Sequence, residues 1–554
     1  MRRKVLLFLG VPLLLGLSFL QCRQKESADL VLLNGNIYAV DNSGIYIEAA
    51  AVRAGKIIAL GPTETIRKQI APSTRVIDLA GKLVLPGFID AHCHFASGGR
   101  SLAGLTLREA KSVEAVQGLV AAKIKELPEG APVFGSEFDH TLFPRAKWPT
   151  KADLDKVSPL NPVILERIDG HSLWVNSLAL RLSGISGKTP NPFGGEISRD
   201  PGTGEPSGIL KEAATRLIRI QPPESNTEED IKRALGLAAR LGLTGIHTSS
   251  TLEELEIYRN LERAGRLTLR VYAWLPIQEI DDYLISNVKS GQGDEMVRIG
   301  FLKIFVDGTV SSSTALLFEP FSDEPDKRGE AQYQEEEFYS LVGKAHRNGY
   351  QIGIHAIGDK GIHWALNAIE KAQRESGKNG TRHRLEHCSL IHPDDVKRFA
   401  ELGVIASMQP THCTTDLSYC ERRFGEERCR GAYIWKTLAG GGAVLAFGTD
   451  WPVEPLDPMR GLYSCVTRQN IDSGDPPGGW FPEQRLSIRE AIKYYTHGPA
   501  YASLEESIKG SLRVGNLADF VVLSDNLLEI EAPKILTTKV FCTIVGGKIV
   551  FQSS

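Results

Sequence analysis

Apolar runs of strand length alternate with amphipathic segments through most of the chain. Apolar side chains recur at helical spacing in residues 228–241, 335–347 and 362–375, which predicts helices that each cover a sheet with one face. Eight nearly continuous apolar runs predict buried strands at residues 83–91, 243–248, 269–274, 298–306, 351–355, 383–387, 404–408 and 444–449. Eight strands that alternate with helices predict the α/β class and, within it, a (β/α)8 TIM barrel.

The first of these runs contains Pro86 and Gly87, which we interpret as part of one extended segment. Shorter strands with turn signals such as Asn34-Gly35 flank the predicted barrel. They are expected at residues 30–40, 48–60 and 75–79 before the barrel, and at 519–523 and 540–550 after it.

A long segment, residues 95–221, separates the first two predicted barrel strands. Insertions that follow a barrel strand lie over the active-site face, so we expect a subdomain or lid that shapes the substrate pocket. Its polar and aromatic residues supply two candidate substrate contacts, His171 and Trp174. Asp307, at the end of a barrel strand, is a third. The alternative for His171 is a structural role as the cap of an internal turn.

The N-terminus has the pattern of an export signal. Positive residues at positions 2–4 precede an apolar stretch over residues 5–20, which is short for a membrane span. Cys22 follows, and the arrangement resembles a bacterial lipoprotein signal, although Gln21 stands where a small residue is usual. We therefore expect a signal peptide at 1–21, lipidation of Cys22, a tether at 22–28, and a protein anchored by lipid in the bacterial cell envelope. A non-lipidated export signal or an uncleaved anchor is the alternative.

The composition and net charge of the chain indicate which kinds of partner it can have. The chain has 554 residues, of which 42% are hydrophobic and 24% charged, and these shares are ordinary for a globular protein. Its formal net charge of -3 argues against nucleic acid as a partner. Of the cysteines after Cys22, a bridge among Cys413, Cys420 and Cys429 is conceivable, but the scattered spacing favours free thiols.

Metal-ligand residues follow the predicted strands. His92 and His94 lie on the same face of an extended segment, since side chains alternate in a strand. Four later strands each carry one further residue of this kind near the C-terminal end, in the order Lys303, His355, His387 and Asp450. Because the C-terminal strand ends of a barrel meet at one mouth, we expect all six residues to converge there.

With these residues the chain resembles the amidohydrolase superfamily, and more narrowly amidohydrolase family 3, which includes formamide deformylase-like enzymes. The matching segments are residues 28–37 (ADLVLLNGNI), 86–94 (PGFIDAHCH), 303–308 (KIFVDG), 386–387 (EH), 448–452 (GTDWP) and 510–519 (GSLRVGNLAD). Two departures are Thr449, where serine is common, and Asn516, where lysine is common. The resemblance implies that residues 29–82 and 511–554 pair into one small, discontinuous β-sandwich domain beside a barrel at 83–510.

The ligand set predicts a hydrolase that depends on a divalent metal, zinc or a similar ion. His92, His94 and Asp450 would hold the first ion, and His355 and His387 a second. Asp450 is also the expected general base and acid. The resemblance implies a carbon dioxide-derived carbamate on Lys303; an unmodified lysine paired with Asp307 is the alternative.

The expected reaction is hydrolysis of a non-peptide C–N bond in a small molecule, such as an N-acyl or N-formyl amine. Deamination and hydrolysis of ureas or esters would use the same residues. A catalytically dead, lipid-anchored binding protein is the competing class, and a homo-oligomer is compatible with either.

Overall fold

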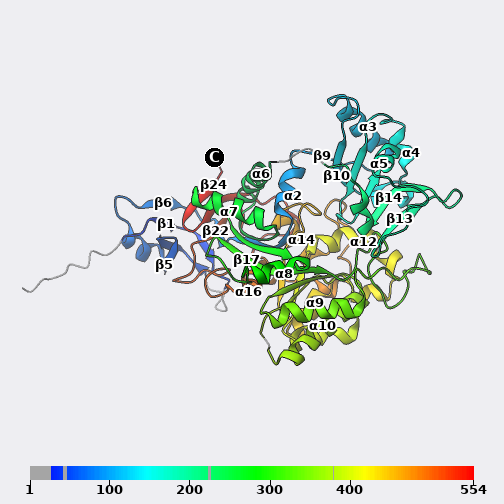
Figure 1. Ribbon diagram of the computed structural model, residues 1–554. Coiled ribbons are helices and arrows are strands. Elements are labelled where there is room, and N and C mark those ends of the chain that lie inside the picture. Colours follow the sequence, from blue (N-terminus) through cyan, green and yellow to red (C-terminus); the bar gives the residue numbers. More distant parts are fainter. Residues whose placement is uncertain (1–26, 41–45, 222–225, 379, 554) are drawn as a thin grey trace, which may run out of the picture.

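The computed structural model describes residues 27–40, 46–221, 226–378 and 380–553 (Figure 1). The predicted signal peptide and Cys22 lie outside these residues. Of the predicted tether, only residues 27 and 28 are described, and the backbone N–H of Ala28 donates to the Gln69 carbonyl at 3.0 Å. Ala28 therefore already belongs to the folded body.

Eight parallel strands form the barrel and confirm the predicted TIM-barrel fold. They are β8 (Phe88–Cys93), β15 (Leu243–Ser249), β16 (Arg270–Pro276), β17 (Val297–Phe305), β18 (Ile352–Ala356), β19 (Arg384–His387), β20 (Ile405–Met408) and β21 (Leu445–Phe447). Hydrogen-bonded neighbours follow the chain order from β15 to β21, and β8 pairs with β15. Past the end of β21, the backbone N–H of Asp450 donates to the His92 carbonyl at 2.6 Å, which links the last strand region to the first.

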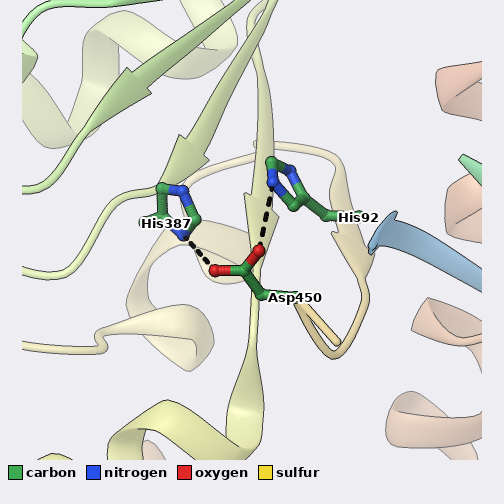
Figure 2. Close-up of side chains that lie close together, drawn as sticks. All are labelled: His92, His387 and Asp450. Carbon is green, nitrogen blue, oxygen red and sulfur yellow. Dashed lines mark ion pairs between the residues drawn. The ribbon is translucent and has the colours of Figure 1, made fainter. Parts of the chain in front are cut away.

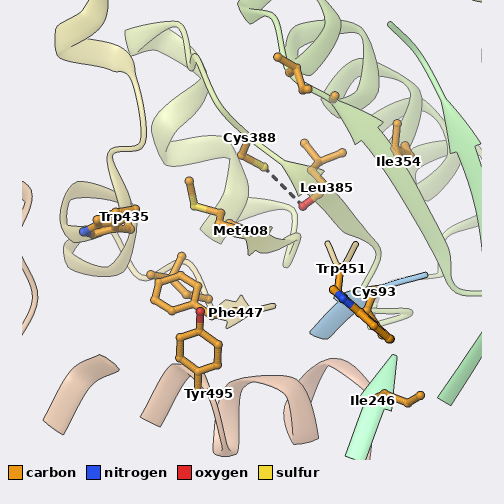
Figure 3. Packing of buried hydrophobic residues seen from close by; sticks show 14 of the residues in the cluster. Cys93, Ile246, Ile354, Leu385, Cys388, Met408, Trp435, Phe447, Trp451 and Tyr495 are labelled. Atoms are coloured by element: carbon orange, nitrogen blue, oxygen red, sulfur yellow. Dashed lines mark hydrogen bonds between the residues drawn. The ribbon is translucent and has the colours of Figure 1, made fainter. Parts of the chain in front are cut away.

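The three predicted helices are α6 (Thr227–Arg240), α9 (Glu335–Arg347) and α10 (Asp359–Ser376). Each packs its apolar face on the barrel, in the largest hydrophobic cluster of the molecule. Figure 3 shows part of this cluster, where Leu385, Met408 and Phe447 from neighbouring strands meet Trp435 and Tyr495. The seven cysteines within the described residues are all buried and free, as the spacing favours.

The first predicted barrel strand is in fact two strands that belong to different domains. The first, β7 (Leu83–Pro86), pairs antiparallel with β22 (Phe520–Leu523) of the sandwich, and β8 begins at Phe88. Gly87 allows the chain to pass close to Thr244 where it leaves the sandwich sheet for the barrel, because a Cβ at residue 87 would lie only 2.0 Å from Thr244 Cγ2. The interpretation of residues 83–91 as one extended strand is therefore wrong, and the domain boundary lies at Gly87.

Two sheets built from both ends of the chain form the small domain. The first sheet has the order β5 (Lys56–Gly61), β4 (Ala49–Arg53), β1 (Leu30–Leu33), β6 (Arg75–Asp78). The second has the order β24 (Lys548–Gln552), β23 (Val540–Val545), β22, β7, β2 (Asn36–Tyr38), β3 (Tyr46–Ile47). Leu32, Val84 and Phe520 share one apolar core between them, so the two termini close a single sandwich.

The insertion after β8 is a folded subdomain. Its sheet has the order β13 (Gly195–Arg199), β14 (Pro206–Glu212), β12 (Ser172–Val175), β11 (Val163–Arg167), β10 (Val133–Phe138), β9 (Leu105–Thr106). Helices α3 (Val113–Ile124), α4 (Lys151–Asp155) and α5 (Ser177–Leu182) pack against it. In Figure 1 this cyan part lies at the end of the molecule opposite the β-sandwich. None of the described helices is both long and apolar enough to cross a membrane.

Candidate active site

A cavity of about 570 Å³ lies between the C-terminal strand ends and the insertion. All six predicted ligand residues line it: His92, His94, Lys303, His355, His387 and Asp450. The structure therefore brings together residues that are up to several hundred positions apart in the sequence. The cavity has the size expected of a site that binds a small molecule.

Asp450 lies close to three of the other five residues. Its Oδ1 atom is 3.5 Å from His92 Nε2 and 3.2 Å from His94 Nε2, and its Oδ2 atom is 4.0 Å from His387 Nδ1. Figure 2 shows the Asp450 carboxylate between the His92 and His387 rings. Ligand atoms of these three residues all lie within 4.8 Å of one another. The carboxylate stays ionised because its contact with His94 outweighs the effect of burial and holds its pKa below the usual range.

This group of side chains fits a divalent cation. Asp450 Oδ1 is buried and accepts no hydrogen bond within the described part of the chain. A buried, unsatisfied carboxylate oxygen is costly unless a charge compensates it. Imidazole nitrogens and a carboxylate oxygen are the ligands that zinc and similar ions take. The side chains present are therefore of the kind that binds zinc or a similar divalent ion.

The backbone around Asp450 is held by Asp90, a residue that the sequence analysis did not assign. Asp90 Oδ1 accepts the N–H groups of His92 and Thr449 at 3.0 Å each, and its Oδ2 accepts the Thr449 hydroxyl at 2.5 Å. Asp450 itself adopts a φ of 59°, which is sparsely populated for a non-glycine residue. One buried carboxylate therefore fixes the relative position of β8 and the Asp450 turn.

His92 is oriented by a buried ion pair on β19. Its Nδ1 donates to Glu386 Oε2 at 2.7 Å, which leaves Nε2 free for a ligand. Arg384 Nε and Nη2 donate to the two Glu386 oxygens at 2.5 and 3.0 Å, and both side chains are fully buried. Burial opposes the ionisation of Glu386, but Arg384 and His92 hold its pKa well below the usual range. Burial lowers the pKa of His92 to about 4, so its imidazole is neutral at pH 7.

Hydrogen bonds to neighbouring oxygens also determine which ring nitrogen of His355 and of His387 is free to bind a metal. His355 Nε2 donates to the Gly308 carbonyl at 3.1 Å, which leaves Nδ1 available. His387 Nδ1 donates to Gln409 Oε1 at 2.8 Å, which leaves Nε2 available. The two rings lie 4.5 Å apart between their centroids. Burial holds the pKa of both imidazoles well below the usual value, so both are neutral and able to bind a metal.

Lys303 is buried on β17 between two aromatic rings. Its Nζ lies 5.2 Å from the centre of the Trp274 ring and 4.9 Å from that of Phe305. Burial lowers the pKa of its ammonium to about 8, although Glu386 and Asp450 favour the charged form. A substantial fraction of neutral amine is therefore present near neutral pH.

The insertion contributes a charged wall to the cavity. His171 Nδ1 contacts Glu212 Oε2 at 2.8 Å, and the His171 ring lies 5.1 Å from the His355 ring. Burial alone would lower the pKa of His171, but Glu212 outweighs it and raises the pKa to about 9. His171 lines the cavity, and its raised pKa favours the protonated imidazole, which can donate a hydrogen bond.

Two of the three candidate substrate contacts are wrong. Trp174 is fully buried in the core of the insertion, where its Nε1 donates to the Thr150 carbonyl at 2.8 Å. Asp307 is also fully buried, and it accepts the backbone N–H groups of Leu316 and Gly358 at 2.9 and 2.8 Å. Asp307 organises loops, and neither residue lines the cavity.

His412 is a residue of the site that the sequence analysis did not single out. Its Nε2 lies 3.9 Å from Asp450 Oδ2, and its ring stacks on that of His387 with 6.1 Å between centroids. It sits in the first turn of α12 (Pro410–Phe424), so a search for ligands at strand ends passes over it. The signal that could have found it is its place four residues after the end of β20.

Comparison with known proteins agrees with this geometry. A model of the amidohydrolase family matches residues 75–551 of the chain.

The chain belongs to the amidohydrolase family.

Protein LONG AFTER FAR-RED 3 of Arabidopsis thaliana is 32% identical, over 94% of this chain and 91% of its own length. The N-substituted formamide deformylase of Arthrobacter pascens is 28% identical, over 95% and 99%. A solved structure of an uncharacterized metal-dependent hydrolase from Pyrococcus horikoshii covers 91% of this chain and 99% of its own, with 30% identity and a TM-score of 0.73. This amidohydrolase is therefore a metal-dependent enzyme that acts on carbon–nitrogen bonds.

Proposed function

We propose that this amidohydrolase hydrolyses an amide-type C–N bond in a small N-acyl or N-formyl amine. The observation that carries the proposal is Asp450, whose ionised carboxylate has a buried, unsatisfied oxygen, Oδ1, within 3.5 Å of the His92 and His94 imidazoles. The formamide deformylase relative supports the amide class. We further propose zinc as the ion, with His92, His94 and Asp450 around one position and His355 and His387 around a second.

The chain's own residues supply the proton transfers. A bound divalent ion lowers the pKa of water toward neutrality and polarises a carbonyl group. Asp450 then accepts a proton from the attacking water and returns it to the leaving nitrogen, because its carboxylate is ionised and faces the cavity. His171, kept protonated by Glu212, can donate a hydrogen bond to the oxygen that gains charge.

A panel of amides, formamides, ureas and esters tests the proposal. Metal-loaded enzyme should hydrolyse at least one amide or formamide faster than the matched ester or urea. Removal of the metal by a chelator should abolish the reaction, and zinc should restore it. Hydrolysis that persists in demonstrably metal-free enzyme, or that is confined to esters, would contradict the proposal.

We propose that Lys303 carries a carbamate, formed when its neutral amine adds carbon dioxide and loses a proton. The burial of Nζ and its lowered pKa support this, because they make the neutral amine available. The Lys303→Ala variant should bind about one fewer metal ion per chain and lose most activity, and short carboxylates should restore part of both. Full metal content and activity in Lys303→Ala would reject the carbamate.

We also propose that the enzyme is exported and held in the bacterial cell envelope by lipid on Cys22. The positive residues 2–4, the apolar stretch 5–20 and the cysteine support this. Replacing Cys22 with alanine should move the enzyme out of the membrane fraction or leave an unprocessed precursor. A wild-type protein recovered in the cytoplasm with residues 1–21 attached would reject it.

A further inference from the structure

A second, much smaller chamber opens from the same centre. Its volume is about 70 Å³, and it shares its polar lining in part with the wide cavity of about 570 Å³, through Arg167, Asp169, His171, His355, His387 and Asp450. One wall is a face of α12, from which His412, Thr415, Asp416 and Tyr419 project at helical spacing. The neighbouring loop adds Glu454.

The wide cavity and the chamber meet at Asp450. Because Asp450 lines both spaces, a substrate bound beside it has room to extend one half into the wide cavity and the other half into the chamber. The chamber has about one-eighth of the volume of the wide cavity, so the two halves of a substrate that fills both spaces differ in size. One half of the substrate must therefore be small.

The charge of the chamber wall favours a cation. Four carboxyl groups besides Asp450 line it, from Asp139, Asp169, Asp416 and Glu454. The cationic groups among the described lining residues are Arg167 and His171, and His171 is already paired with Glu212. The donors of Arg167 are engaged as well. Arg167 Nη2 contacts Asp139 at 2.7 Å, Nη1 contacts Asp169 and the Ser311 hydroxyl, and Nε donates to His140. Arg167 therefore has little capacity left to bind a carboxylate product.

Among the described residues, the hydrogen-bond donors to Asp416 and Glu454 are hydroxyl groups. The Tyr419 and Tyr433 hydroxyls donate to Asp416, and the Thr415 hydroxyl donates to Glu454 Oε1 at 2.7 Å. Within the described part of the chain, neither carboxyl group forms an ion pair with a lysine or arginine. Hydroxyl donors satisfy hydrogen bonds but do not compensate a buried negative charge.

We propose that the chamber takes the amine half of the substrate, so that the enzyme prefers amides of small amines with a larger acyl group in the wide cavity. This inference rests on the proposed function. Hydrolysis breaks the C–N bond, forms a C–O bond from water, and leaves a carboxylate and an amine that becomes an ammonium ion at neutral pH. Asp416 and Glu454 attract that ammonium ion, and they would repel a carboxylate in the same place. The exposed ring of Phe193 at the cavity rim offers apolar contact to the acyl group.

Two isomeric amides test the orientation directly. N-Methyl-2-phenylacetamide and N-benzylacetamide are isomers. The first contains a small amine, methylamine, and the second contains a small acyl group, acetyl. We expect kcat/KM for the first to be at least about tenfold higher, because pocket discrimination of this kind is worth about 10–200-fold. Equal values, or a preference for N-benzylacetamide or an N-formyl amine, would overturn the inference and leave the proposed function intact.

Product binding provides a readout that does not depend on turnover. Methylammonium should bind the metal-loaded enzyme and protect it against thermal unfolding more than acetate does. Glu454→Gln keeps an oxygen for the Thr415 hydroxyl, and it should weaken methylammonium binding at least about tenfold. Glu166→Gln is the matched control, because Glu166 lines the wide cavity and not the chamber; it should leave methylammonium binding unchanged.

Amide hydrolysis tests the proposed function, and methylammonium binding tests the role of the chamber independently of it. If no amide of the panel is hydrolysed, the proposed function fails, and methylammonium binding alone decides the chamber. Tighter binding of acetate than of methylammonium, or equal loss in both variants, overturns the inference. Unchanged metal content in Glu454→Gln serves as the check that the variant is folded.

Discussion

Replacing Asp450 with asparagine should lower kcat by about 10²–10⁴-fold or more, the range expected for loss of a general acid–base group. Asparagine has nearly the same shape, so the turn after β21 and its bond from the Asp450 N–H to the His92 carbonyl should persist. The side chain that results cannot accept a proton from water at neutral pH. Steady-state kinetics on the best amide of the panel, together with metal analysis, measure the effect.

His92, His94 and His387 remain in Asp450→Asn, so much of the metal should remain as well. Asp281→Asn is a suitable control, because Asp281 is exposed and pairs only with Lys344 on the surface. A variant with near-normal kcat would reject Asp450 as the proton carrier. A variant that loses both metal and kcat in proportion would assign Asp450 a ligand role alone.

Replacing Arg384 with methionine should lower the free energy of unfolding by about 3–5 kcal/mol, because it leaves Glu386 as an unpaired charge in the barrel interior. Arg384 and Glu386 are both fully buried and joined by two hydrogen bonds. Chemical denaturation of the metal-free protein, followed by fluorescence, would measure the loss.

Arg382→Met is the matched control two residues away. Arg382 makes the same kind of paired contact with Glu506, but both side chains are about a quarter exposed, so the cost should be about 0–1 kcal/mol. The double variant Arg384→Met/Glu386→Gln should recover part of the stability and yet bind metal weakly, because His92 loses the carboxylate that orients it. Equal losses in Arg384→Met and Arg382→Met would contradict this account.

The residues that converge on the cavity could be predicted because each stands at the end of a predicted strand. Barrel topology brings such ends together whatever lies between them, so His92 and Asp450 meet although 357 residues separate them in the chain. The residues that orient the ligands could not be found in this way. Glu386 and Gln409 are recognised only by the atoms they contact, and those contacts depend on how neighbouring strands align.

The two wrong assignments have a common cause. Trp174 was predicted from its residue type in the insertion and Asp307 from its place at a strand end, and neither signal shows the backbone groups that these buried side chains bind. Trp174 lies in β12, whose neighbours β11 and β14 form the insertion core. Pro86 and Gly87 illustrate the same limit, since only the pairing of β7 with β22 shows that a strand ends there.

The pairing of β7 with β22 also sets an order of events during synthesis. Residue 87 alone separates β7 from the first barrel strand, whereas β22 begins at residue 520. A growing chain therefore presents the open edge of β7 until almost all of the polypeptide has left the ribosome. Open strand edges attract other chains, so truncation before β22 should yield aggregates in place of a smaller, stable barrel.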